Sequence, residues 1–207
     1  VLSARAAADV PPKTESPAKT APAASAPAAD DNTARGREAY LRGIQRSRDS
    51  QWGEALAAFE EAAVARDPPL VQYKIAFGQR ALSRYVTARR TFRRVVENPE
   101  GLASSQLDDS KAFVAELDKL IVHVALTLDP PAAQLTVDGR PLTAVTEAGA
   151  TVYVALPAGS SAAGPTDKAF NLELDPGVHL FRAVRAGHQD AFVSRTYNPG
   201  EKTTPAL

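Results

Sequence analysis

Three histidines are the side chains of this chain best suited to metal binding or proton transfer. His123, His179 and His188 all fall in the second half of the sequence, and Asp190 lies close to the last of them. A metal site needs two or three such ligands converging with a carboxylate, and helical ligand pairs stand four residues apart. None of the histidines has that spacing, so we expect strand or turn positions and no metal. The absence of cysteine excludes disulfides and thiolate chemistry.

The sequence carries no familiar catalytic motif. It has no Gly-rich phosphate loop ending in Lys-Ser or Lys-Thr, no G-x-S-x-G elbow, no H-E-x-x-H pair and no dinucleotide fingerprint. The stretch GSSAAG at 159–164 offers serines, but no motif places a base or an orienting acid beside them. We therefore predict a protein that is not an enzyme and holds no cofactor.

Four arginines form the most concentrated charge. Arg89, Arg90, Arg93 and Arg94 comprise two pairs, each one helical turn apart, and so predict a basic stripe along a helix. Two interpretations stay open: a solvated face, with Glu97 one turn beyond Arg93, or a docking patch for an acidic partner. The formal net charge of zero and the lack of a base-reading motif argue against nucleic acid.

A repeat of thirty-three residues runs through the middle of the chain. SQWGEALAAFEEA at 50–62 matches SRYVTARRTFRRV at 83–95, with small and aromatic residues kept and charges changed. Such a period is typical of stacked helix pairs, in which small residues permit close approach and aromatic residues fill the core. The matched pairs are Tyr40 with Tyr73, Gly43 with Ala76, Ile44 with Phe77, Trp52 with Tyr85, Ala55 with Ala88, Phe59 with Phe92 and Ala62 with Val95.

This pattern resembles the tetratricopeptide repeat (TPR), a two-helix unit with a small residue in its first helix and an Ala, Phe, Ala series in its second. The departures are Arg42 and Arg46, where the family usually has large apolar residues, and Val95 in place of the last alanine. The matching residues are Gly43, Ala55, Phe59 and Ala62 with Pro68 after them, then Ala76, Ala88 and Phe92 with Pro99 after them.

The resemblance implies a concave groove, lined by the first helix of each pair, that binds a protein or peptide. Apolar and aromatic side chains edged by cations would suit a partner bearing acidic groups. The same side chains could instead pack between helices or under the next domain, and both interpretations stay open. The residues placed in the groove are Arg37, Tyr40, Leu41, Ile44, Arg48, Tyr73, Lys74, Phe77 and Arg80.

Two repeats leave an apolar face that needs a cover. Residues 105–119 predict a capping helix, with Ser105 as N-cap and Asp108 three residues on. Beyond residue 120 the apolar period changes to two, as in Val122, Val124 and Leu126, and turn signals follow at Asp138-Gly139, Pro176-Gly177 and Asn198-Pro199-Gly200. These features predict an α+β chain whose helices precede a small antiparallel β-sandwich.

Residues 121–207 are similar to the PEGA domain, named for a Pro-Glu-Gly-Ala turn that reads Pro130-Pro131-Ala132-Ala133 here. Residues 143–168 are expected to form an inserted loop. The resemblance implies a non-catalytic module of bacterial envelope and surface proteins, often found beside TPRs. Its landmarks are Val137-Asp138-Gly139, Pro176-Gly177 with His179, Gly187, and Gly200.

The first 33 residues are rich in Pro, Ala, Ser, Thr and Lys and predict a flexible tether. Their start, VLSARAAADVPP, is typical either of the end of a secretory signal with an A-x-A cleavage site at Ala6 and Ala8, or of an alanine-rich linker. The first interpretation places the protein in the periplasm, the cell envelope or outside the cell. No apolar run is long enough to span a membrane. The expected units are 1–33, 34–120 and 121–207.

Together these patterns predict a non-catalytic protein-binding or scaffold protein of the bacterial envelope, whose groove holds a protein or peptide partner. Two alternatives stay open. One is a structural or glycan-facing envelope protein, for which Tyr153 and Tyr197 are the available tyrosines of the β domain. The other is a fragment of a larger regulatory protein. Oligomeric state is left open.

Overall fold

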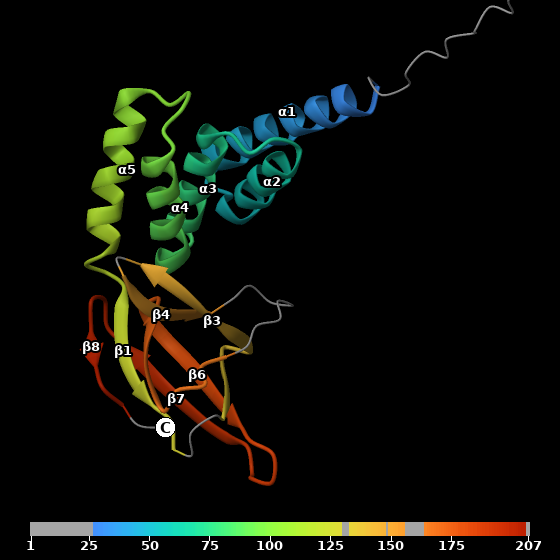
Figure 1. Ribbon diagram of the computed structural model, residues 1–207. Helices are drawn as coiled ribbons and strands as arrows, with labels where there is room; N and C mark the ends of the chain where they lie inside the picture. The colour runs from blue at the N-terminus through green and yellow to red at the C-terminus, as the bar shows by residue number, and fades with distance from the viewer. Residues whose placement is uncertain (1–26, 130–132, 148, 156–163, 206–207) are drawn as a thin grey trace, which may run out of the picture.

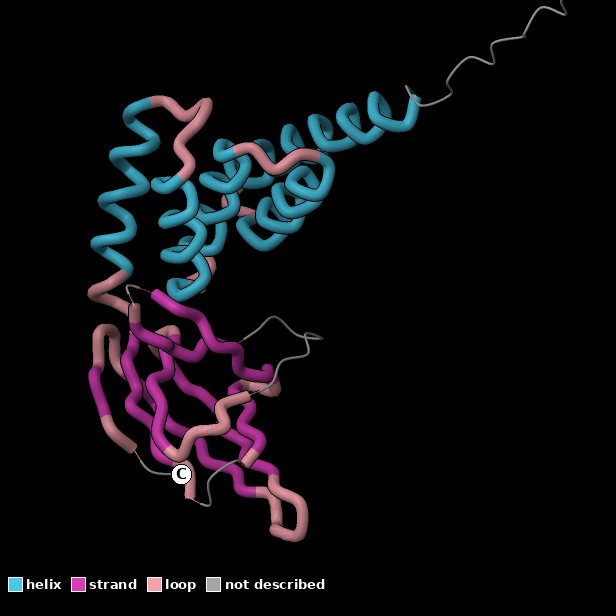
Figure 2. The backbone as a smooth tube through the Cα atoms, in the orientation of Figure 1, coloured by secondary structure: helices cyan, strands magenta, loops and turns pink. Residues whose placement is uncertain are grey.

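The structure, a computed structural model, describes residues 27–129, 133–147, 149–155 and 164–205, in which five helices precede a curved sheet of eight strands (Figure 1). The chain is therefore of the α+β class. Helices and strands occupy separate halves of the molecule (Figure 2). The helices are α1 (Pro27–Arg48), α2 (Trp52–Ala65), α3 (Pro69–Ala81), α4 (Tyr85–Glu97) and α5 (Ser104–Leu117).

The strands are β1 (Val122–Thr127), β2 (Gln134–Val137), β3 (Arg140–Glu147), β4 (Ala150–Ala155), β5 (Ala169–Leu174), β6 (Gly177–Val184), β7 (Ala191–Tyr197) and β8 (Lys202–Thr203). They follow the order β7-β6-β2-β3-β4-β5-β1-β8 across the sheet. Strand β4 pairs in parallel with β5, and β1 pairs in parallel with β8. The expected purely antiparallel sandwich is therefore replaced by a mixed sheet that curls into a half-barrel (Figure 1).

The first two helices pack closely as an antiparallel pair because glycines stand at their contacts. A Cβ added to Gly43 would lie 2.5 Å from the ring of Phe59, and one added to Gly36 would lie 2.6 Å from Cβ of Ala65. A real side chain would force the helices apart at either position. Thus Gly43 has the role that the sequence predicts for it, and Gly36 has the same role near the other end of the pair.

The sequence repeat is also a structural repeat. Ser50 and Ser83 both have φ of 58°. The amide of Gln51 donates to the carbonyl of Arg46 at 2.9 Å, and the amide of Arg84 donates to the carbonyl of Gln79 at 2.9 Å. These equivalent positions all lie thirty-three residues apart. The same left-handed turn therefore connects α1 to α2 and α3 to α4.

Aromatic rings link the repeats through the core. Phe59 and Phe92 are the buried equivalents in the two pairs. The ring centroid of Phe77 lies 5.8 Å from that of Trp52 and 5.8 Å from that of Phe113, while Phe92 and Phe113 are 5.2 Å apart. These distances are those of favourable aromatic pairs, so helices α2 to α5 share one continuous contact.

The capping helix forms, with a start that differs from the expected one. Helix α5 begins at Ser104, and its N-cap is Ala103, whose amide donates to Oε1 of Gln106 at 3.0 Å. Ser105 therefore lies inside the first turn and is not the N-cap. Phe113 and Leu117 of α5 pack against the α3–α4 pair, which is the covering role that the sequence predicts.

Helix α1 begins before the expected boundary. Residues 27–33 belong to α1 and not to a flexible tether, so the expected start of the helical region at residue 34 is too late. The rest of the predicted tether and signal segment, residues 1–26, lies outside the described residues. The first turns of α1 extend past the end of α2 (Figure 1).

The β half also differs from expectation between residues 143 and 168. Strands β3 and β4 form a hairpin there, with Leu142 paired to Ala155 and Glu147 to Ala150, so an inserted loop is the wrong description of 143–155. The Asp138-Gly139 turn forms as predicted, with φ of 52° and 72°. Residues 156–163 and the 130–132 part of the PEGA-like turn lie outside the described residues.

Candidate functional site

Helix α4 lies against the sheet, and a carboxylate of the β half caps its N-terminus. Oδ1 of Asp175, in the turn between β5 and β6, accepts a 2.8 Å hydrogen bond from the amide of Val86. Arg84, at the N-cap position of α4, makes no side-chain cap of its own. Burial raises the pKa of Asp175 above its usual value, although this hydrogen bond and the charge of His179 act in the opposite direction.

Arg89 is the centre of a charge network between the two halves. Its side chain is 3% exposed, and Nη2 donates to Oε2 of Glu173 on β5 at 2.5 Å and to Oε2 of Glu147 on β3 at 2.9 Å. Nη1 donates to Oδ1 of Asp118 at 3.1 Å. Burial alone would lower the pKa of Arg89, but the hydrogen bond that it donates to Glu173 and the charges of the three carboxylates raise it, so the guanidinium remains charged.

The four-arginine stripe therefore does not face solvent as a unit. Arg89 is buried in the interface. Arg93 donates to the carboxylates of Glu147 and Asp118, so it also bonds to the β half and to the end of the helical half. Arg90 is half-exposed, and Arg94 is exposed. The acidic groups that meet Arg89 and Arg93 belong to this chain itself, a possibility that helix periodicity alone does not show.

Apolar contacts complete the interface. Val86 of α4 packs with Ile121 and Val154 in one buried cluster, and Tyr85 and Val145 pack against it. On the far side, the amide of Gly200 donates to the carbonyl of Leu120 at 2.9 Å. Because helix cap, ion pairs and apolar side chains all cross the same boundary, the helical stack and the sheet pack as one continuous body.

A pocket opens at the other end of the helical stack. It has a volume of about 250 Å³ and lies between α1, the end of α2 and the start of α3. Its floor is apolar, and Arg37 and Arg66, both exposed, stand among its lining residues without any acidic neighbour in that lining. Burial raises the pKa of the half-buried Tyr40. The lining residues are Thr33, Gly36, Arg37, Tyr40, Ala62, Ala65, Arg66, Pro68, Leu70 and Val71.

Only two of the nine expected groove residues, Arg37 and Tyr40, line this pocket. Arg66, Pro68 and Leu70 also line the pocket and were not predicted from the sequence. The sequence signal for these residues is Pro68-Pro69. A proline pair favours the start of a new helix, and α3 does begin at Pro69, shortly after the end of α2, so that the pocket lies between the two helix ends.

Three of the other seven expected groove residues, Tyr73, Phe77 and Ile44, pack in the cores of the helical half. Tyr73 is buried, with its ring 6.1 Å from that of Phe92 and 6.4 Å from that of Phe77. Burial, then the charge and hydrogen bond of Asp109, raise the pKa of Tyr73.

The remaining expected groove residues are two cations of α3 and two residues of α1. Arg80 bonds to Glu116 at 2.8 Å and lies 4.6 Å from the ring centroid of Phe113, and Lys74 lies 5.6 Å from that of Tyr73. Ile44 packs on the core of the first helix pair, whereas Leu41 and Arg48 are exposed.

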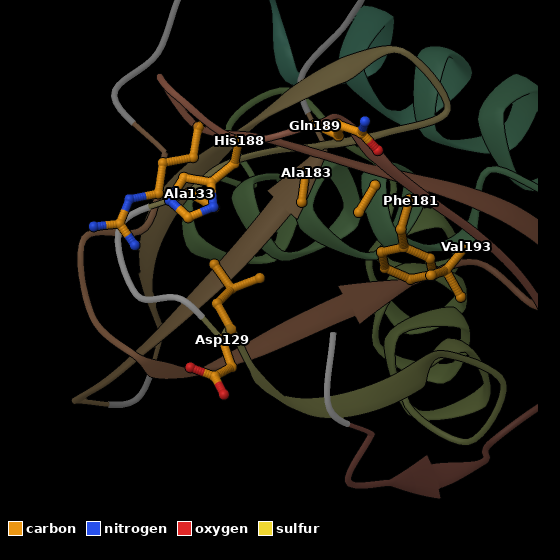
Figure 3. Close-up of a pocket in the computed structure, with 10 residues that line it drawn as sticks. Asp129, Ala133, Phe181, Ala183, His188, Gln189 and Val193 are labelled. Carbon is orange, nitrogen blue, oxygen red and sulfur yellow. The ribbon is translucent and has the colours of Figure 1, made fainter.

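The β half has a smaller cavity of about 80 Å³ at the far end of the sheet (Figure 3). Phe181, Ala183 and Val193 line it, and the carboxylate of Asp129 points away from them (Figure 3). His188 and Arg185 stand at its edge, and both are exposed. The cavity has room for one small apolar side chain, and the charged and polar residues among its described lining, Asp129, Arg185, His188 and Gln189, are exposed.

The histidines do not converge. His179 bridges two turns, with Nδ1 2.7 Å from Oδ2 of Asp138 and Nε2 donating to the carbonyl of Asp175 at 2.7 Å. His123 lies 3.6 Å from Glu173. Within the part of the chain that the structure describes, no three His, Asp or Glu side chains are grouped closely enough to hold a metal ion. In that same part, no helix has the length and hydropathy needed to cross a bilayer.

Comparison of the chain with known protein families, curated proteins and solved structures gave no match.

Proposed function

We propose that this chain is a non-catalytic binding protein of the bacterial envelope. In this proposal its helical half is a short TPR-type array that holds a peptide of a partner protein, and its β half is a PEGA-type module that supports the array. The repeated turns at Ser50 and Ser83 and the close approach at Gly43 favour the array assignment. The pocket between α1 and α3 is the observation that carries the binding role.

The chemistry of that pocket defines the partner. Leu70 and Val71 supply an apolar surface, and Tyr40 adds a ring with a hydroxyl group. A volume of about 250 Å³ suits one or two apolar side chains and not a large cofactor. Arg37 and Arg66 would then pair with carboxylates next to those side chains. The partner is therefore a peptide segment with an apolar residue flanked by acidic residues.

A glycan-facing role has less support. Sugar-binding surfaces use exposed aromatic rings as platforms, and the two tyrosines of the β half do not offer one. Tyr197 is buried, and Tyr153 is half-buried with its ring 5.1 Å from that of Phe170. The exposed ring of Phe192 lies 5.8 Å from the guanidinium of Arg182, which itself bonds to Asp190.

The proposal is tested with a panel of labelled synthetic peptides and the full chain. Each peptide carries one Leu or Phe between Asp or Glu residues, and its partner peptide replaces the acids by Asn or Gln. Fluorescence anisotropy should detect binding of the acidic peptides only. The double variant Arg37→Glu/Arg66→Glu should weaken it by at least about tenfold, the effect of losing one charge-assisted contact.

Arg35→Glu/Arg48→Glu is the matched control, because both arginines are exposed on α1 and do not line the pocket. It should leave peptide binding unchanged. An equal loss in this control, or equal binding of the neutral peptides, would contradict the assigned site. If no peptide binds and an oligosaccharide array does, the glycan-facing alternative replaces the proposal.

A further inference from the structure

A second and larger hollow lies between α4 and the end of β3. Its volume is about 540 Å³, and it is separate from the α1–α3 pocket. Three arginines from two successive turns of α4 line one wall, and β3 forms the other. The lining residues are Gln79, Thr87, Arg90, Thr91, Arg93, Arg94, Glu97, Val145, Thr146 and Glu147.

The carboxylate of Glu147 does not neutralise all of these arginines. It accepts hydrogen bonds from Arg93 and, at 2.9 Å, from the buried Arg89. Nε of Arg90 forms only a long ion pair with Oε1 of Glu147, at 3.7 Å, which is beyond hydrogen-bond distance. Two guanidinium groups, those of Arg89 and Arg93, therefore already share the charge of Glu147, and little of it is left to neutralise Arg90.

Arg94 is less well paired still. Its Nη2 donates to the neutral amide oxygen of Gln72 at 3.1 Å. Among the described residues, no carboxylate lies within ion-pair distance of Arg94, and Glu97 in the same lining forms no ion pair. Arg90 and Arg94 stand one helical turn apart, so their side chains project from the same face of α4.

We infer that this cleft binds a phosphate-bearing ligand, held between Arg90 and Arg94. Two guanidinium forks one turn apart can donate to the several oxygens of one phosphate or diphosphate group, which a single carboxylate cannot match. Thr146, on the opposite wall, adds a hydroxyl group to the lining. Arg93 stays with Glu147, so ligand binding does not require the interface between the halves to open.

The test is a calorimetric titration of the full chain with inorganic pyrophosphate at fixed ionic strength, because exposed charges are screened by salt. The double variant Arg90→Gln/Arg94→Gln should raise the dissociation constant by at least about tenfold, as expected for losing charge-assisted hydrogen bonds. The matched control is Arg35→Gln/Arg48→Gln, which removes the same charge from exposed positions on α1. It should leave the dissociation constant unchanged.

Arg90→Lys/Arg94→Lys provides a second variant, which keeps the charge and removes the forks. Intermediate binding by this variant supports bidentate recognition. Three results would overturn the inference: an equal loss of affinity in the α1 control, no heat of binding at millimolar pyrophosphate, or a hexaglutamate peptide that binds as tightly as pyrophosphate does and loses that affinity in Arg90→Gln/Arg94→Gln. The last result would assign the cleft to carboxylates. None of these outcomes depends on peptide binding at the α1–α3 pocket.

Discussion

Arg89 of α4 donates a 2.5 Å hydrogen bond to Glu173 of β5, and both side chains are almost fully enclosed, at 3% and 6% exposed. A buried ion pair of this kind is not by itself evidence of added stability, because both charges lost their hydration. Its effect here is positional. It joins the middle of α4 to the end of β5, eighty-four residues further along the chain.

Arg89→Met should destabilise the protein by about 3–5 kcal/mol, because it leaves Glu173 buried without its cation. Chemical denaturation followed by circular dichroism measures the loss. The double variant Arg89→Met/Glu173→Met should recover much of it, since neither charge is then buried alone. Arg94→Met on the exposed side of the same helix should change stability by no more than about 0.5 kcal/mol. Equal effects of the Arg89 and Arg94 variants would show that the network is unimportant.

Asp175→Asn should raise stability at pH 7 or leave it unchanged. Burial raises the pKa of Asp175, so the folded protein holds this proton more tightly than the unfolded chain does. Stability is therefore lost as pH rises from the unfolded pKa through the folded one, and an uncharged amide avoids that loss while still accepting from Val86. Any advantage of the amide should vanish in acid below the usual pKa of aspartate.

Asp175→Ala separates the two roles of this side chain. It removes the acceptor of Val86 at the start of α4, which should cost about 1–3 kcal/mol. Unfolding curves collected across a series of pH values compare both variants with the wild type. The interpretation fails if the asparagine and alanine variants lose the same stability at pH 7.

Gly43→Val should destabilise the helical half by about 1–3 kcal/mol, the usual cost of overpacking a core. The Cβ of the new valine would lie 2.5 Å from the ring of Phe59, which fills the contact between α1 and α2. Gly53→Ala is the control, because a Cβ at Gly53 meets nothing within 4 Å. That control should instead stabilise α2 by about 0.5–1 kcal/mol through helix propensity. Thermal melts of the two variants should move in opposite directions.

Ala55→Arg should abolish the cooperative unfolding of the helical half, because Ala55 is fully buried where the helices cross and its replacement forces a charge into that contact. The variant Ala57→Arg, two residues further along on the exposed face of α2, should fold normally. Differential scanning calorimetry distinguishes the two. A full transition in the Ala55 variant would argue against the packing described above.

The helix pairs and strand turns could be predicted from sequence because each depends on neighbours within a few residues. Ala55 and Phe59 share a helical stripe, and Asp138-Gly139 is a local signal for a tight hairpin. The mixed pairing could not be predicted in the same way. The parallel contact of β4 with β5 depends on strands brought together by the curl of the sheet, which no local period encodes.

The charge network around Arg89 could not be predicted from local sequence patterns either, because its partners lie far apart in the chain. Arg89 lies three residues before Phe92, so it borders the buried stripe of α4, but a charged side chain at such a position is ordinarily expected to face solvent. The structure shows that Glu173, a carboxylate between Leu172 and Leu174, is buried like both of its neighbours, so only the end of β5 is covered on both faces. One of those covers is α4. The start of α1 was missed because its first turns are polar and carry no apolar stripe.

The turn that holds Asp175 has a mechanical consequence. Since Asp175, in the turn between β5 and β6, caps the start of α4, the two halves are joined there as well as through the chain between α5 and β1, and they cannot rotate freely about that connection. A peptide bound beside Arg66 would be held in a fixed orientation relative to any partner of the β half. A mechanical force applied to either half would be transmitted to the other. The protein would then act as a rigid connector and not as two domains on a flexible linker.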